Sequence, residues 1–418
     1  MTTVLFDATR LLLRAPRGAP TGIDRVALAY AHWLTARTDI DLKPVWGVGG
    51  ALTQMSRQRF AQLLAAAMPY GATGEANEAP SPAWPKLVAA LQAPDDRSVL
   101  RSQPSAGPDL KAALWFGGLA LRTPMLLAAA KTSAGAVYLN VSHFGLEQPG
   151  LLARLARAGV RPVVMIHDLI PIRWPEYCAP GAAARHARRI EGALRHGRLI
   201  IANSRATADD LAAYAAATGL PLPELCIAPL GLSAPFHGRP TPLSTPRPYF
   251  LAIGTIEPRK NLAFLLTLWN RLAERLGAAA PRLVVVGRRG WENEAVLDLL
   301  ERAPGVRRLV HEVADLRDSE LAQLVAGASA LLAPSLAEGF DLASLEALAL
   351  GTPVIASDIA AHRELATGAR LVDPLDGPGW ARAIEASLQA RPTPAPFSAP
   401  TWEQHFTLVG PALDRCAG

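Results

Sequence analysis

The sequence predicts an α/β protein with two units, each a parallel β-sheet covered by helices. The chain has 418 residues, more than one ordinary core accommodates. Half of the residues are hydrophobic and only 19% are charged, so the chain can bury large interiors and is not a disordered protein. Short apolar runs alternate with helical segments, which is the pattern of parallel sheets.

The alternation is clearest in the second half. Apolar, β-branched runs predict buried strands at 249–255, 282–287, 308–313, 329–335 and 353–357. Helices are predicted at about 261–276, 291–302, 318–327, 342–350 and 376–390. Ligands of such sheets bind beyond the carboxyl ends of the strands, in the loops that open the helices. The chemically suggestive motifs of this half fall in those loops.

The first half repeats the scheme less regularly. Strands are predicted at 3–9, 41–48, 136–142, 162–168 and 198–204. Helices are predicted near 23–37, 55–67, 147–158, 181–196 and 205–217. Residues 71–108 are rich in Pro, Ser, Ala and Asp, and they predict a long loop or insertion around one short helix at 85–93.

A Pro-rich segment predicts the boundary between the two units. Residues 237–248 hold four prolines in twelve residues, a stiff and extended composition typical of linkers. We therefore expect an N-terminal domain over 1–236 and a C-terminal domain over 249–398. A last helical segment falls within 399–418.

The remaining composition argues against several classes of protein. The three cysteines are widely separated and form no C-x-x-C pair, so a disulfide framework or a zinc site is not expected. The N-terminus is apolar but contains Asp7 and has no cationic lead-in, so it predicts a first strand rather than a signal peptide. No apolar run reaches about 18 residues, the length that suggests a membrane span. A cytoplasmic location is the default expectation.

Positive charge is concentrated in residues 151–199. The chain carries a net charge of +6, and this segment alone holds nine arginines against three acidic residues. One interpretation is a solvated helix face at 181–199. The other is attraction to an anionic membrane surface, worth about 1 kcal/mol per cation near the lipid. Nucleic-acid binding is not expected, because no aromatic residues interleave the arginines of the stretch 181–199 and no recognition motif accompanies it.

Two glutamates flank a predicted helix start in AEGFDLASLEALALGTPVIASD. Glu338 lies in the loop after a strand, and Glu346 lies eight residues later inside the helix. A helix start presents free N–H groups and partial positive charge, so it suits a diphosphate. The loop carboxylate can accept hydrogen bonds from sugar hydroxyls, and the second carboxylate can reach a ribose diol. By composition alone, such a pair is usually a helix cap and a surface residue.

This segment resembles the Glu-x7-Glu signature of the retaining glycosyltransferase family 4. GTPVIASD extends the match in phase, and ARLVDPLD at 369–376 echoes the end of the family's domain. The resemblance implies the GT-B architecture, in which two Rossmann-like domains face each other across a cleft and a last helix crosses back to the first domain. It also implies that a sugar-nucleotide donor contacts Gly339, Phe340 and Leu342.

Asp341 departs from the family pattern. Members commonly have Gly-Phe-Gly-Leu-Pro where this chain has Gly-Phe-Asp-Leu-Ala. A glycine lets the backbone approach a ligand closely, whereas Asp341 adds bulk and negative charge. Asp341 is a helix cap, a contact to a donor-sugar hydroxyl, or a residue that weakens donor binding. The departure leaves the donor's identity more open than the reaction class.

Two adjacent cations, Arg259 and Lys260, open a helix after the strand at 249–255. Fixed cations there would neutralise a departing diphosphate, which Mg²⁺ does in other transferases. As an isolated loop tip, the pair would be ordinary solvated charge. The run GTIEPRKNL resembles the family's Arg…Lys phosphate clamp, in which the backbone at Gly254 and Thr255 approaches the donor. The resemblance implies no cofactor and no metal ion.

The loop VGRRGWENE at 286–294 resembles a segment of mannosyltransferase-like members. Trp291 has two interpretations: it lines the nucleotide pocket, or it packs against the helix that follows. The second is favoured. With the clamp run, this loop favours GDP-mannose as the donor by pattern similarity.

The first half carries a loop candidate in PTGIDRV at 20–26. Alone it is a weak dinucleotide fingerprint. It resembles the family's first loop, Gly-Ile-Gly-Arg, which closes over the donor phosphates through Gly22 and Ile23. Asp24 replaces a glycine there, and an acid beside a diphosphate is unfavourable unless it points away or holds Arg25.

Strand ends of the first half supply the remaining candidates. A lone histidine at a strand end is more often structural, but His167 matches the family's histidine that faces the donor sugar. Asp168 and His143 are weaker candidates for the acceptor side. Ser204 is expected to be a helix N-cap.

Together the matches imply a retaining glycosyltransferase. It would transfer a hexose, with mannose favoured, from a nucleotide-diphosphate sugar to a polysaccharide or lipid-linked oligosaccharide. The basic segment at 151–199 would suit an acceptor at the inner face of the membrane. A sugar-nucleotide epimerase or hydrolase on the same fold is one alternative. A non-catalytic scaffold, raised by Asp24 and Asp341, is another. The expected catalytic set is Glu338, His167, Arg259 and Lys260, with Glu346 holding the ribose.

Overall fold

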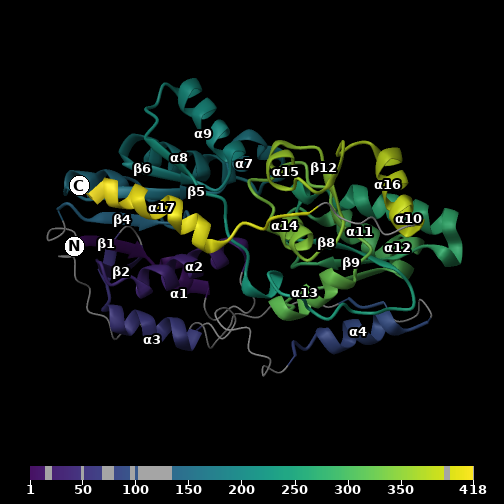
Figure 1. The fold of residues 1–418 in the computed structure, drawn as a ribbon. Coiled ribbons are helices and arrows are strands. Elements are labelled where there is room, and N and C mark those ends of the chain that lie inside the picture. The colour runs from purple at the N-terminus through teal and green to yellow at the C-terminus, as the bar shows by residue number, and fades with distance from the viewer. Residues whose placement is uncertain are drawn as a thin grey trace.

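The computed structural model of the chain contains two β-sheets, each flanked by helices (Figure 1). It describes residues 1–14, 21–48, 51–67, 80–94, 99–101, 134–389 and 396–417. We call the sheet formed by the first half of the sequence, with its helices, the first lobe. The second sheet with its helices is the second lobe. Most of the loop predicted at 71–108 lies outside the described residues.

Within the described residues, the first sheet has seven strands. They are β1 (Thr2–Asp7), β2 (Ile40–Val48), β3 (Ala51–Gln54), β4 (Val137–Asn140), β5 (Arg161–Ile166), β6 (Leu199–Ala202) and β7 (Glu224–Ile227). Their order is β3-β2-β1-β4-β5-β6-β7, and within it only β2 and β3 pair antiparallel. The strands predicted in this half are present. β3 and β7 were not predicted, because four-residue edge strands with mixed side chains are hard to tell from loops.

The helices of the first half follow its strands. They are α1 (Thr9–Arg14), α2 (Gly22–Ala36), α3 (Arg57–Ala67), α4 (Trp84–Gln92), α6 (Leu151–Arg157), α7 (Ile170–Arg173), α8 (Ala182–His196) and α9 (Arg205–Thr218). Short 3₁₀ turns η1 (Pro175–Tyr177) and η2 (Ala234–Phe236) complete the set. As predicted, Ser204 caps α9, accepting a hydrogen bond from the Thr207 amide at 3.0 Å.

The second sheet has six strands, all parallel. They are β8 (Tyr249–Ile253), β9 (Arg282–Val286), β10 (Val310–Val313), β11 (Leu331–Ala333), β12 (Val354–Ser357) and β13 (Arg370–Val372), in the order β10-β9-β8-β11-β12-β13. Strands such as β9 and β12 consist mainly of apolar residues and are buried along their whole length, as expected for parallel strands covered on both faces.

The second lobe's helices alternate with these strands. They are η3 (Pro258–Lys260), α10 (Leu262–Leu276), η4 (Gly277–Ala279), α11 (Glu294–Arg302), α12 (Pro304–Leu309), α13 (Asp318–Gly327), α14 (Leu342–Ala349), α15 (Ala360–Leu365) and α16 (Gly377–Gln389). The strand predicted at 308–313 was placed two residues too early. Pro304 opens α12 at its first turn, and this helix runs to Leu309 before β10 begins.

The last helix, α17 (Trp402–Ala417), lies against the first sheet although it follows the second lobe in the chain (Figure 1). Its His405 ring is 2.8 Å from the Tyr30 hydroxyl, and Phe406 stacks on Trp33 with ring centroids 4.4 Å apart. This packing joins the end of the chain to α2.

A segment of the first half contacts the second lobe. Arg282 of β9 donates hydrogen bonds to the carbonyls of Leu91 and Ala93, at 2.6 and 2.7 Å, next to the end of α4. The Ser81 hydroxyl donates to Glu320 of α13 at 2.6 Å. Figure 1 shows α4 lying below the second lobe, away from the first sheet.

Candidate active site

The loops after β8 and β11 bring together the cations and the first glutamate that the sequence singled out. Glu338 follows β11, and its carboxylate lies 2.6 Å from Nη1 of Arg259 and 2.6 Å from Nζ of Lys260. Both cations belong to η3, after β8, the strand beside β11 in the sheet. Arg259 also pairs with Glu257 through Nε at 2.5 Å. The site therefore lies at the carboxyl ends of neighbouring parallel strands.

Burial and charge set the ionisation of this cluster. The Glu338 side chain is 6% exposed, and burial raises its pKa, but the attraction of Arg259 and Lys260 is larger and leaves the pKa below its usual value. Burial raises the pKa of Glu257, which shares Arg259. Glu338 is therefore an anion between two cations.

Gly254 lets the Lys260 side chain lie close to the end of β8. Gly254 has φ +140°, and a Cβ added to it would lie 2.8 Å from Cε of Lys260. In the next loop, Gly290 packs on the same turn, where an added Cβ would lie 2.8 Å from Thr255 Cγ2. These glycines hold the loops after β8 and β9 against each other.

Asp341 occupies the N-cap position of α14 in the left-handed conformation, with φ 61°. Its carboxylate makes no capping bond to the helix backbone. The carboxylate instead accepts a 2.5 Å hydrogen bond from the Ser344 hydroxyl and lies 3.1 Å from Nε2 of His362. Nζ of Lys260 is 3.7 Å away. Glycine suits such a backbone best, and aspartate is among the few residues that tolerate it.

The two lobes approach each other closely at Gly339. A Cβ added to Gly339 would lie 2.1 Å from the His167 carbonyl oxygen. The Ser204 hydroxyl donates to the Gly339 carbonyl at 2.8 Å. The neighbouring Phe340 is buried in a hydrophobic cluster that includes residues of both lobes. The Glu338 loop is therefore in contact with the ends of β5 and β6.

His167 is buried at the end of β5. Its Nε2–H donates to the Val141 carbonyl at 2.8 Å, because a carbonyl can only accept. Burial lowers the pKa of His167, so the ring is neutral and Nδ1 carries a lone pair. The structure thus leaves His167 as a hydrogen-bond acceptor through Nδ1.

His143 and Asp168, the two candidates for the acceptor side, accept hydrogen bonds from backbone amides. His143 has φ 61°, and its Nε2 accepts a 3.2 Å hydrogen bond from the His167 amide. Burial lowers the pKa of His143 well below its usual value. Asp168 accepts from the Ile170 amide at 3.0 Å, and His186 binds the Asp168 carbonyl at 2.9 Å. These bonds fix the loop that presents His167.

Glu346 forms an ion pair across the lobes. Its Oε1 is 2.6 Å from Nη1 of Arg25 on α2, and Nη2 of Arg25 is 2.5 Å from Asp318. Burial raises the pKa of Glu346 to about 7, more than Arg25 lowers it. Gly22 faces the start of α14, where its added Cβ would lie 3.4 Å from Cδ1 of Leu342, and Ile23 follows it on α2. The starts of α2 and α14 thus approach each other.

Asp24 does not hold Arg25, as one interpretation of the sequence required. It accepts hydrogen bonds from the Thr21 amide at 2.9 Å and from Arg10 at 2.7 Å. Asp24 thus contacts the start of α2 and Arg10, and Arg25 pairs with Glu346.

In the loop after β9, the position of Trp291 differs from the packing that the sequence favoured. Trp291 is 40% exposed, so it does not seat α11 by burial. Arg288 pairs with Asp315 at 2.7 Å, and Arg289 pairs with the buried Glu312 at 2.6 Å. The two arginines of this loop therefore bind carboxylates at the end of β10.

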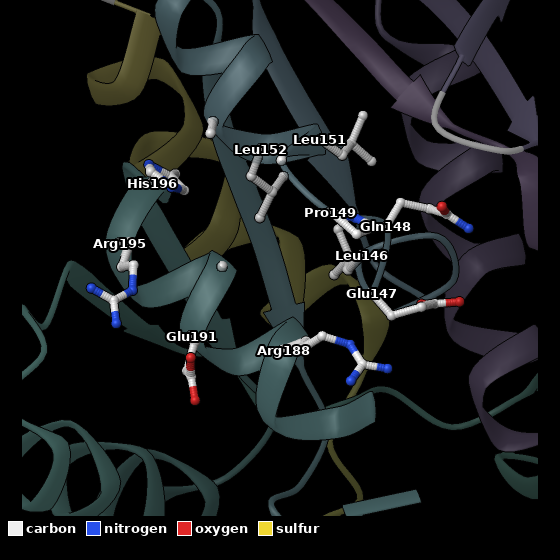
Figure 2. A pocket seen from close by; sticks show the side chains of 13 residues that line it. Leu146, Glu147, Gln148, Pro149, Leu151, Leu152, Arg188, Glu191, Arg195 and His196 are labelled. Atoms are coloured by element: carbon white, nitrogen blue, oxygen red, sulfur yellow. The ribbon is translucent and has the colours of Figure 1, made fainter. Parts of the chain in front are cut away.

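A hollow of about 200 Å³ lies in the first lobe, between the loop before α6 and helix α8 (Figure 2). Glu147, Arg188, Glu191 and Arg195 are the charged residues that line it. The hollow belongs to the basic segment of the sequence and not to the Glu338 cluster. Among the residues that the structure describes, no three His, Cys, Asp or Glu side chains are arranged to hold a metal ion. No helix of the described part is long and apolar enough to cross a bilayer.

Residues 247–390 match the family model described as glycosyl transferases group 1. Serotype-specific mannosyltransferase WbdA of Escherichia coli is 29% identical over 224 residues, which are 50% of this chain and 27% of that protein. O-antigen chain mannosyltransferase B of Escherichia coli is 38% identical over 143 residues, 34% of this chain and 37% of that protein. The chain therefore covers much less than half the length of these relatives.

Two solved structures match the whole chain. HepE of Anabaena in complex with UDP-glucose has a TM-score of 0.58 at 15% identity. The match covers 100% of this chain and 98% of the HepE chain. Sucrose-phosphate synthase from Thermosynechococcus elongatus has a TM-score of 0.56 at 16% identity. That match covers 100% of this chain and 96% of the synthase chain. The fold is GT-B. The fold class predicted from the sequence is confirmed.

The sequence carries no motif for His362 and Ser344, the two partners of the Asp341 carboxylate, or for Glu364, which binds the start of α9. Ser344 lies one helical turn from Asp341, whereas the fold brings His362 to Asp341 and Glu364 to α9. Arg25 was noted only as a possible partner of Asp24, because 321 residues separate it from Glu346. Polar residues on the helices after β11 and β12 were the available signal, since those helices open at the same edge of the sheet.

Proposed function

We propose that the protein is a retaining glycosyltransferase that moves a hexose from a nucleotide-diphosphate sugar to a glycan. The observation that carries this proposal is the Glu338 cluster, with two cations and a carboxylate beside the start of α14. The family match over 247–390 covers all of these residues. The reaction would form a bond between an acceptor oxygen and C1 of the sugar, and break the bond from C1 to the diphosphate. The acceptor's proton would pass to the departing phosphate oxygen.

The donor's diphosphate would lie at the start of α14, against Arg259 and Lys260. Both cations are already held within 2.6 Å of Glu338, so little side-chain ordering is left for binding. Free N–H groups of the helix start and two fixed cations together stabilise a leaving diphosphate. Residues of the chain would thus supply the positive charge, without a metal ion.

The donor sugar would lie between Glu338 and His167. Glu338 Oε1 is buried and lies 2.6 Å from Lys260 Nζ, and a carboxylate oxygen has a second lone pair, so it can also accept a hydrogen bond from a sugar hydroxyl. His167 Nδ1 would accept a second. Gly339, between them, keeps the lobes close enough for both. Glu346 would bind the ribose diol while it shares or gives up Arg25.

Mannose is the favoured sugar, with GDP-mannose as the donor. The relatives named as mannosyltransferases support this choice, while the structural relative bound to UDP-glucose supports a uridine donor. Arg288 and Arg289, in the loop at 286–294, favour neither donor, because each arginine is paired with a carboxylate of the second lobe. Trp291, exposed in that loop, is available for stacking on a base.

The acceptor would be a polysaccharide or a lipid-linked oligosaccharide. The relatives named as O-antigen chain mannosyltransferases support such an acceptor. The basic segment 151–199 supports a membrane-borne one, because Arg154, Arg185 and Arg188 are exposed on α6 and α8. The protein would then bind the cytoplasmic face of the membrane at its surface.

A donor panel tests the proposal. GDP-mannose, UDP-glucose, UDP-galactose and UDP-N-acetylglucosamine would each be added in EDTA, with and without glycan acceptors, and products would be followed by NMR. We expect one donor to be consumed much faster than the others and, with an acceptor, to give a product of unchanged anomeric configuration. An isomerised sugar nucleotide without acceptor would indicate an epimerase, and an inverted product would refute the retaining mechanism.

A further inference from the structure

The Asp341 carboxylate is a buried negative charge beside the proposed phosphate site. Its side chain is 3% exposed, and its Oδ1 lies 3.7 Å from Nζ of Lys260. Sequences of the family that this chain resembles commonly have an uncharged glycine at this position. An added anion beside a diphosphate would weaken binding unless another group balances its charge.

The hydrogen bonds of His362 identify such a group. Its Nδ1 lies 2.8 Å from the Ser357 carbonyl, and a carbonyl only accepts, so Nδ1 carries a hydrogen. Its Nε2 lies 3.1 Å from Oδ2 of Asp341, which already accepts the Ser344 hydroxyl. A proton must therefore lie either on Nε2, which makes the ring an imidazolium, or on Asp341.

The surroundings decide between these two positions. Lys260 faces Asp341 from the loop after β8, and Glu338 acts on His362 from the loop after β11. Burial alone would lower the pKa of His362, but its bond and attraction to Asp341 outweigh burial and raise it. Burial would raise the pKa of Asp341, but Lys260 and His362 reverse this and lower it. On α15 itself, Glu364 is bound to the start of α9.

We propose that His362 is a positioning residue whose imidazolium balances the Asp341 carboxylate and so keeps the charge of Lys260 available to a diphosphate. This inference rests on the proposed donor site and adds a residue to it. Asp341, held by Ser344 and His362 through Oδ2, keeps Oδ1 toward Lys260. Loss of the His362 proton would leave a buried anion next to the donor's phosphates.

The protonation state is tested first, without any ligand. Two-dimensional NMR of the histidine ring nitrogens, recorded on the full chain, distinguishes an imidazolium from either neutral tautomer. We expect His362 to remain an imidazolium above the pH at which an ordinary histidine titrates, about 6.5. In the Asp341→Asn variant it should lose its proton at lower pH. A neutral His362 ring at pH 6 in the wild type would overturn the proposal.

Nucleotide affinity is tested second, with GDP and UDP as probes in a calorimeter. The His362→Gln variant should bind the preferred nucleotide about tenfold more weakly at pH 7, since one uncompensated charge at short range is worth about 1.4 kcal/mol or more. Above pH 7, wild-type affinity should fall over the pH range in which NMR shows His362 losing its proton. The His362→Gln variant should lack that fall and keep only the pH dependence that Glu346, with a pKa of about 7, contributes to both proteins.

A double variant separates charge balance from simple loss of structure. Asp341→Asn combined with His362→Gln removes both charges, so its affinity should return to within about threefold of the wild type. The matched control is His311→Gln on β10, a buried histidine of the same lobe whose pKa is lowered to about 3 and which is therefore neutral. It should leave affinity and its pH dependence unchanged.

Two results would overturn the role in binding. One is a His362→Gln variant that binds like the wild type, and the other is a double variant as weak as the single one while its melting temperature matches the wild type. If the wild type binds neither nucleotide, the proposed function fails, and the NMR result still decides whether His362 balances Asp341.

Discussion

At the scale of single residues, the protonation of Glu346, which pairs with Arg25, makes the free energy of unfolding depend on pH. Burial raises the pKa of Glu346 to about 7 from a usual value of 4.5. Between these two pH values, the folded protein binds a proton that the unfolded chain has released. The free energy of unfolding therefore decreases as the pH rises through this window.

The Glu346→Gln variant should lose this pH dependence. From pH 5 to pH 8, wild-type stability should fall relative to that of the variant by up to about 3 kcal/mol, the equivalent of the shift in pKa. Urea unfolding at each pH measures it. Glu147→Gln, which removes the partner of Arg189 inside the first lobe, is the control and should retain the wild-type slope. Parallel curves for Glu346→Gln and the wild type would contradict the account.

Some residue contacts could be predicted from the sequence and others could not. Arg259, Lys260 and Glu338 follow recognisable strands, and the carboxyl ends of neighbouring parallel strands meet, so their proximity follows from the pattern. The contacts of Arg25 with Glu346 and of His362 with Asp341 depend on how lobes and helices pack. Sequence pattern carries no information about that packing.

At the scale of elements, the close contact between two loops sets the geometry of the site. The loop from β11 to α14 touches the end of β5 through Gly339, at a spacing that no side chain fits. Under the proposed function, this contact would let Glu338 and His167, which lie on opposite lobes, reach one donor sugar.

The Gly339→Ala variant tests that contact. The added Cβ would lie 2.1 Å from the His167 carbonyl oxygen, so the loops must separate. We expect a loss of stability of about 1–3 kcal/mol, typical of overpacking, and a fall in transfer rate of at least about 100-fold because the reacting groups are displaced. The Gly377→Ala variant in the same lobe has its nearest atom at 3.7 Å and should change neither quantity. Full activity in Gly339→Ala would show that the contact does not position the site.

Element prediction failed where local signals were weak. The edge strands β3 and β7 have four residues each, too few for a clear period of alternation. The helix α12 was missed because its apolar residues merge with those of β10, and only Pro304 marks its start. The long, buried strands and the helices between them were predicted with errors at their ends.

At the scale of the whole molecule, polar contacts join the two lobes at points far apart in the sequence. Glu364 of α15 accepts hydrogen bonds from the Arg205 and Ala206 amides, at 2.6 and 2.8 Å, and so binds the start of α9. Ser204 binds Gly339, and Arg25 binds Glu346. These contacts hold the lobes together in the arrangement described. The two-sheet architecture could be predicted from the sequence, but these contacts between lobes could not.

The Glu364→Ala variant should loosen this arrangement. Removing a carboxylate from a helix start costs about 1 kcal/mol, so the amides of Arg205 and Ala206 should exchange with solvent about fivefold faster. Hydrogen exchange read by NMR measures both amides. Amides in β9 and β12, inside the second lobe, serve as the internal reference and should not change. Unchanged exchange at α9 would show that Glu364 does not hold the lobes.

The most direct test of the whole account is calorimetric binding of GDP and UDP in the presence of EDTA. We expect the wild type to bind at least one of them without a divalent cation, and Lys260→Ala to weaken this binding at least about tenfold, through the loss of one charge-assisted contact to phosphate. Lys86→Ala, on the exposed face of α4, should bind like the wild type. Binding that requires Mg²⁺, or that is unchanged in Lys260→Ala, would contradict the account.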